Sequence, residues 1–126
     1  MLLLLCGLYS LAFAIFHLFF WKIFRWKQDL AKLQFYNRGI MQILNLRLSY
    51  LFLMMAALFF FYGDTLSGTP MGRMIIGAMA IFWLGRTIEQ FIFLNVNNKF
   101  VHLLTLIFAL GTILHAMPLA FYFLGL

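Results

Sequence analysis

Residues 40–62 read IMQILNLRLSYLFLMMAALFFFY, an apolar run that carries a single charged side chain, Arg47. The hydrocarbon core of a bilayer is about 30 Å thick, and about 20 mostly apolar residues in an α-helix cross it. Three further stretches share this length and character, at about residues 2–24, 74–94 and 100–124. We therefore expect an all-α membrane protein, a four-helix transmembrane bundle that forms a single transmembrane domain over residues 1–126.

The composition supports this expectation. Hydrophobic residues make up 66% of the chain and charged residues 10%, whereas a soluble domain averages about 45–50% apolar and about 25% charged residues. The net charge of +6 would indicate nucleic acid in a soluble protein. Here the basic residues alternate with apolar runs, so we expect membrane lipids as partners, other membrane subunits or self-association as further partners, and no nucleic acid.

The basic residues also predict an orientation. The first connection and its flank hold most of them, at Lys22, Arg25, Lys27, Lys32 and Arg38. The third connection, residues 95–99, holds Lys99, while the second, residues 63–72, holds none and is followed by Arg73. Because basic residues in short loops stay on the cytoplasmic side, both termini are expected on the non-cytoplasmic side.

Several polar residues fall inside the expected spans. A charge in the hydrocarbon core costs roughly 2.5–3.5 kcal/mol, so each one is a candidate functional residue. At a rise of about 1.5 Å per residue, His17, Arg47 and Glu89 lie roughly 6–8 Å to the cytoplasmic side of the midplane. Asn45 and Gln90 lie at about 9 Å and Arg86 at about 3 Å on the same side. The spacing thus predicts one polar layer, formed by His17, Asn45, Arg86, Glu89 and Gln90.

This layer has two interpretations. Arg86 and Glu89 stand three residues apart and share a helix face, so they can simply neutralise each other, with Asn45 and Gln90 as interhelical hydrogen-bonding groups. Alternatively, the layer is a half-buried pocket for a headgroup, a proton or a small polar ligand. Arg47 lies nearly opposite Asn45 on its helix and is expected to extend towards the headgroups.

The histidines raise the question of a haem. Two axial ligands must face each other at similar depth, but His17 and His115 differ by about 10 Å along the membrane normal, and His102 misses by a similar amount in the other direction. We therefore expect no cofactor and no metal site. His115 precedes Pro118 by three residues, and we expect it to bond a carbonyl freed by the proline.

Three sequence stretches, FHLFFWKIFRW, NRGIMQILNLRLSY and WLGRTIEQF, resemble a family of small bacterial four-helix integral membrane proteins of unassigned function. The resemblance implies the fold and a bacterial inner membrane. It carries over no activity. The matching positions are His17, Asn37, Asn45, Arg86 and Gln90.

Three functions fit these observations. The first is a non-enzymatic module that binds a lipid or another amphiphile, or an accessory subunit of a membrane complex. The second is a small membrane enzyme or redox protein (haem or quinone) that uses His17, Arg86 and Glu89. The third is an oligomeric transporter, since four helices rarely enclose a pathway alone. No residue is assigned a catalytic role.

Overall fold

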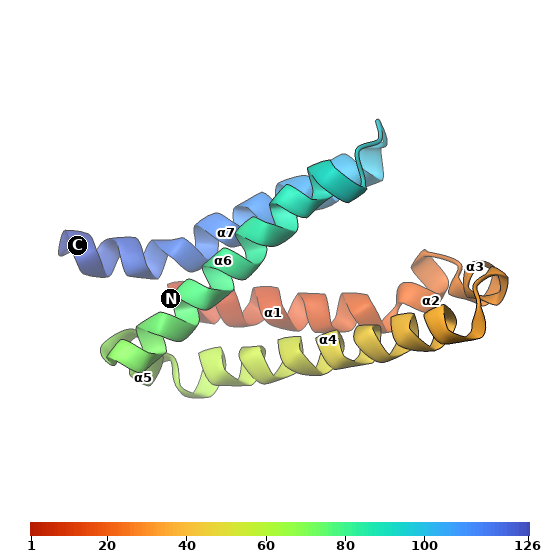
Figure 1. Cartoon of the computed structure of the whole chain (residues 1–126). Helices are drawn as coiled ribbons and strands as arrows, with labels where there is room; N and C mark the ends of the chain where they lie inside the picture. Colours follow the sequence, from red (N-terminus) through yellow and green to blue (C-terminus); the bar gives the residue numbers. More distant parts are fainter. The chain divides into compact units, whose positions relative to one another are not determined.

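The chain is all-α in its computed structural model, which describes residues 1–126 (Figure 1). In chain order the helices are α1 (Leu2–Leu18), α2 (Phe20–Ile23), α3 (Trp26–Asp29), the 3₁₀ helix η1 (Leu30–Lys32), α4 (Phe35–Phe61), α5 (Gly63–Gly68), α6 (Pro70–Phe93) and α7 (Lys99–Leu124). The contacts divide the chain into two compact units, one of residues 1–6 and 59–126 and the other of residues 7–58.

Three helices, α4, α6 and α7, are long and apolar enough to cross a membrane. They indicate a multi-pass membrane protein, as the composition predicts. The apolar helix α1 has 17 residues, or about 25 Å, which is less than the thickness of the hydrocarbon core. The first span was expected to continue to about residue 24, but the helix stops at Leu18 and resumes in α2.

The interruption after α1 coincides with a run of bulky rings, Phe19, Phe20 and Trp21, which lose rotamer freedom in a helix. Phe19 leaves the helical region at φ −96° and ψ 7°, and its N–H bonds the carbonyl of Phe16 at 3.1 Å. Arg25 then adopts a left-handed conformation, with φ 52°, and begins α3. The connection between the first two expected spans therefore contains α3 followed by η1, and α4 starts at Phe35, ahead of the expected residue 40.

The connection expected as a loop over residues 63–72 is mostly helical, because one hydroxyl serves two helix ends. Thr69 Oγ1 donates to the carbonyl of Thr65 at 2.8 Å, in the last turn of α5. The same oxygen accepts from the N–H of Gly72 at 3.0 Å and so caps the start of α6. Pro70 at the first turn of α6 needs no N–H partner, which favours a helix start there.

The turn between α6 and α7 is closed by Asn98. Its Oδ1 accepts hydrogen bonds from the N–H groups of Phe100 at 2.8 Å and Val101 at 3.2 Å, two donors that have no partner within the helix. The two helices pack against each other along the turn and beyond it (Figure 1). This antiparallel pair carries most of the predicted polar residues.

A glycine sets the contact between α5 and α6. A Cβ built on Gly72 would collide with the main-chain carbonyl of Leu66, so no larger residue fits without moving the backbone. A Cβ built on Gly77 would meet Leu119 of α7 at 3.3 Å, a tight contact, whereas Gly85 has open space around it.

Candidate functional site

The residues of the predicted polar layer fall into two groups. His17 and Asn45 lie in the unit of residues 7–58, and Arg86, Glu89 and Gln90 lie in the unit that contains α6 and α7. Each group has its own contacts. His17, Asn45 and Gln90 are buried, Arg86 is half-buried, and Glu89 is exposed on the outer surface of α6.

His17 and Asn45 are joined directly. The Nδ2 amide of Asn45 donates to the main-chain carbonyl of His17 at 2.9 Å. That carbonyl belongs to the last turn of α1, where helical carbonyls have no partner in their own helix. The imidazole itself donates through Nδ1 to the carbonyl of Phe13 at 2.8 Å and stacks on Phe20 with a centroid distance of 4.4 Å.

Two serines extend this polar contact, and the sequence analysis did not select either for the layer. Ser49 donates to the carbonyl of Asn45 at 3.0 Å, one turn along α4. Ser10 is 0% exposed on α1, two turns before His17, and its Oγ has no hydrogen-bond partner. The Oδ1 atom of Asn45 is also buried without a partner. The seven-residue spacing of Ser10 and His17 was the available signal, since it places both on one helix face.

Gln90 connects α6 to α7. Its Nε2 donates to Thr105 Oγ1 at 3.1 Å and to the carbonyl of Val101 at 3.3 Å. Thr105 in turn donates to the carbonyl of Val101 at 2.9 Å. The side chain of Gln90 is 2% exposed, and its Oε1 accepts no hydrogen bond. The amide therefore has a fixed orientation and a vacant acceptor.

Arg86 forms no salt bridge with Glu89, although the Glu89 charge acts on it electrostatically. Its guanidinium lies over the ring of Phe108 at 4.5 Å, and it forms no hydrogen bond or salt bridge with any residue of the chain. Phe108 stacks in turn on the indole of Trp83, with a centroid distance of 5.8 Å and an interplanar angle of 19°. The cation thus rests on an aromatic stack, and Glu89 acts on it as a nearby charge rather than through a salt bridge. Sequence spacing could not find Phe108, because it lies on α7.

The other two histidines have separate environments. His115 is fully buried and donates through Nδ1 to the carbonyl of Gly111 at 2.8 Å, one turn back in α7. The expectation that it bonds a carbonyl freed by Pro118 is therefore wrong. Pro118 lacks the N–H that would bond Leu114, and the thiol of Cys6 meets that carbonyl at 3.7 Å. His102 is exposed, with Nε2 3.1 Å from Asn97 Oδ1.

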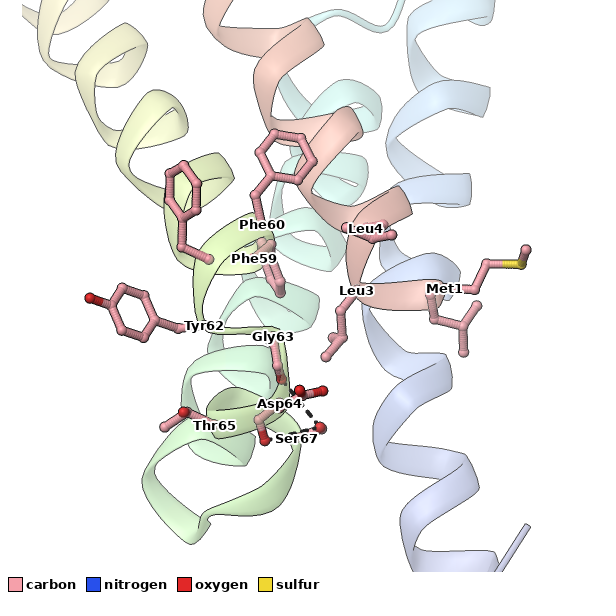
Figure 2. A pocket seen from close by; sticks show the side chains of 12 residues that line it. Met1, Leu3, Leu4, Phe59, Phe60, Tyr62, Gly63, Asp64, Thr65 and Ser67 are labelled. Atoms are coloured by element: carbon pink, nitrogen blue, oxygen red, sulfur yellow. Dashed lines mark hydrogen bonds between the residues drawn. The ribbon is translucent and has the colours of Figure 1, made fainter.

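A hollow of about 750 Å³ opens at the start of α5. Its walls are residues 2–4 of α1 and 59–61 of α4, and its rim is formed by residues 62–65 and Ser67 (Figure 2). Figure 2 shows the ring of Tyr62 pointing away from Leu3, while Gly63, Asp64 and Ser67 gather at one edge. The sequence analysis treated this segment only as a loop.

No group of three or more His, Cys, Asp or Glu residues could hold a metal ion. Arg47 is exposed on α4 and lies 5.7 Å from the ring of Tyr50. Comparisons with protein families, with curated proteins and with solved structures found no match to this chain. The family resemblance carried by His17, Asn45 and Arg86 therefore stays a prediction.

Proposed function

We propose that the protein is a four-span membrane protein that binds an anionic amphiphile through Arg86 in the α6–α7 pair. In this proposal α1 and α2 together form the first crossing, and both termini lie on the non-cytoplasmic side. The basic residues around α2, α3 and η1 support that orientation. The resemblance would place the protein in a bacterial inner membrane.

The observation that carries the proposal is the depth of the Arg86 guanidinium. Arg86 lies seven positions before Phe93, the last residue of α6, or about 10 Å from that helix end. Phe108 lies nine positions after Lys99, the first residue of α7, or about 14 Å from the same end of the pair. The guanidinium is thus directed towards the bilayer interior rather than towards the nearer headgroups.

A cation at this depth needs compensation. Insertion of an arginine near the bilayer centre costs roughly 2.5–3.5 kcal/mol, and contact with an aromatic face returns about 0.5–2 kcal/mol. The ring of Phe108 lies against the guanidinium of Arg86. The N–H groups lie in the plane of the guanidinium and stay available as hydrogen-bond donors. Those donors match the paired oxygens of a phosphate or carboxylate. A bound anion would supply the missing partner.

Gln90 stands one turn from Arg86 on α6, but its Oε1 is buried, so it is not assigned to the ligand. The outer faces of both helices are apolar and would accommodate hydrocarbon chains, as Leu84 and Leu106 illustrate. A phospholipid with a glycerophosphate headgroup has both an anion and hydrocarbon chains. We therefore take an anionic phospholipid of the phosphatidylglycerol type as the probe.

Binding is better supported than catalysis. Glu89, the one carboxylate in the expected spans, is exposed and does not approach Arg86 as a salt bridge. His17 directs Nδ1 to its own helix and is held by aromatic contacts. A proton-transfer mechanism would require the members of such a set to lie within hydrogen-bond reach of one substrate. The polar side chains described above hold helices together or are available to bind a ligand instead.

The test is lipid retention measured by native mass spectrometry. Purified protein is exchanged into equal amounts of phosphatidylglycerol and phosphatidylcholine, and the retained lipid is counted. We expect the wild type to prefer phosphatidylglycerol about tenfold, a value typical of a charge-assisted hydrogen bond. Arg86→Gln should lose this preference. Arg47→Gln is the matched control and should keep it, because Arg47 is exposed on another helix.

Two results would refute the proposal. One is a wild type without headgroup preference, and the other is an Arg86→Gln variant that retains phosphatidylglycerol as the wild type does. The same spectra report the oligomeric mass. If a carboxylate of a second copy or of another subunit pairs with Arg86 in place of a lipid, the wild type should be an oligomer that dissociates in Arg86→Gln. The amount of retained lipid should then be unchanged.

A further inference from the structure

The hollow at the start of α5 combines an apolar wall with an oxygen-rich rim. Residues 2–4 and 59–61 supply leucine and phenylalanine side chains to the wall. Its volume of about 750 Å³ lies within the usual range of small-molecule sites, about 300–1,000 Å³. Because α5 connects α4 to α6, two helices of spanning length, the hollow lies at a membrane boundary whichever way the chain is oriented.

The rim carries a carboxylate that has no partner. The side chain of Asp64 forms no hydrogen bond or salt bridge with any residue of the chain. Asp64 lines the hollow together with Gly63 and Ser67 (Figure 2). The hydroxyl of Ser67 donates to the carbonyls of Gly63 at 3.2 Å and Asp64 at 3.4 Å. Its oxygen therefore presents lone pairs rather than a proton. The rim is a set of hydrogen-bond acceptors.

A cation stands beside this acceptor set. The guanidinium of Arg73 donates through Nη1 to the carbonyl of Ser67 at 3.0 Å, and it lies over the ring of Tyr122 at 4.0 Å. That hydrogen bond uses one of five guanidinium donors. One negative group on α5 and one positive group on α6 thus both stand near Ser67, and Arg73 lies beside the hollow rather than in its lining. Together they are complementary to a zwitterion rather than to a single charge.

We propose that this hollow binds the headgroup of a zwitterionic phospholipid with a primary ammonium, of the phosphatidylethanolamine type. The ammonium lies against Asp64 and the oxygen of Ser67, the phosphate faces Arg73, and the first part of an acyl chain lies on the leucine and phenylalanine wall. A primary ammonium has three N–H donors for these acceptors, and a quaternary ammonium has none. This site is separate from Arg86, which lies thirteen positions, or about 20 Å, along α6 from Arg73.

The experiment uses full-length protein exchanged into equal amounts of phosphatidylethanolamine and phosphatidylcholine, with retained lipid measured by native mass spectrometry. These lipids differ at the ammonium alone. We expect the wild type to prefer phosphatidylethanolamine about tenfold, because a hydrogen bond to a charged group contributes about 1.5–3 kcal/mol. Asp64→Asn should reduce the ratio to near one. Asp29→Asn is the control, because it removes a carboxylate from α3, away from the hollow. It should leave the ratio unchanged.

A second variant tests the cavity without changing a charge. A Cβ on Gly63 would meet Leu3 at 3.6 Å, an ordinary contact, so Gly63→Leu is expected to fold while its side chain fills part of the hollow. It should lose phosphatidylethanolamine and keep the phosphatidylglycerol preference that Arg86 supplies. A wild type that does not distinguish the two ammonium lipids would overturn the inference even if no variant folds. So would undiminished preference in Asp64→Asn or Gly63→Leu.

Discussion

The side-chain amide of Asn45 on α4 holds the main-chain carbonyl of His17 at the end of α1, with an N–O distance of 2.9 Å. This contact lies where α1 stops, next to the aromatic run that interrupts the helix. A side-chain amide on α4 thus satisfies a carbonyl at the end of α1 that has no donor in its own helix. The contact gives Asn45 a structural reason to be polar, whatever its role in binding.

Replacement of Asn45 by leucine should destabilise the protein. It removes the donor to His17 and leaves that carbonyl buried without a partner, at a cost of about 0.5–2 kcal/mol. Asn45→Asp should cost more, because a carboxylate would face a carbonyl oxygen. The control is Gln42→Leu, since Gln42 bonds only its own helix, at Arg38. Thermal unfolding in detergent is the measurement, and equal effects of Asn45→Leu and Gln42→Leu would contradict the assignment.

Arg86 should be coupled more strongly to Phe108 than to Glu89. The guanidinium lies on Phe108 and forms no salt bridge with Glu89. A double-mutant cycle of Arg86→Gln with Phe108→Leu should show a coupling of about 0.5–2 kcal/mol. The corresponding cycle with Glu89→Gln should show a smaller coupling, because Glu89 is exposed and acts on Arg86 without a salt bridge. A larger coupling to Glu89 than to Phe108 would restore the neutralising pair that sequence spacing favours.

The effects of substituting Cys6 and Pro118 on stability should be coupled, although the two residues lie far apart in the sequence. The proline leaves the Leu114 carbonyl without its helical donor, and the Cys6 thiol meets that oxygen. Pro118→Ala supplies an N–H, so Cys6→Ala should cost about 0.5–1 kcal/mol less in that background. Loss of sulfur packing is the same in both backgrounds and cancels from the cycle. Identical costs in the two backgrounds would mean that the thiol contact contributes nothing.

Gly72→Ala should be among the most damaging small substitutions in this chain. Its Cβ would collide with the main chain at Leu66, which cannot rotate away as a side chain can. We expect a loss of more than about 3 kcal/mol, or failure to accumulate folded protein. Gly85→Ala is the matched control in the same helix. It meets open space and should be neutral or stabilising, since alanine favours a helix by about 1 kcal/mol over glycine.

The proposed orientation predicts which engineered cysteines react in intact cells. Lys32 and Ser67 are both exposed, and the single native cysteine, Cys6, is buried, which keeps the background low. With both termini outside, Ser67→Cys should react with a membrane-impermeant maleimide and Lys32→Cys should react only after the cells are opened. The reverse pattern would invert the topology and the leaflet assigned to each lipid site. Reaction at both positions in intact cells would place Lys32 and Ser67 on the same side and rule out a single crossing by α4 between them.

The apolar runs by themselves determined that the chain is all-α and that α4, α6 and α7 are long enough to span a membrane. Run length and composition are local properties, so they can be read without knowing which helices touch. The start of α6 at Pro70 was not predicted, since the third span was expected from about residue 74, although its cap, Thr69, acts within three residues of its own position. The charges in the connections predict an orientation, and the labelling experiment is its test.

Only the tertiary structure decided which polar residues meet. Depth along a helix placed His17, Asn45, Arg86, Glu89 and Gln90 in one layer, but depth does not specify the direction in which a side chain points. Asn45 bonds a main-chain carbonyl, and such partners leave no trace in the pattern of residue types. Arg86 finds Phe108 on another helix, while Glu89 is directed outwards from the same one. Contacts between helices depend on rotation and packing, which the order of residues along one helix does not contain.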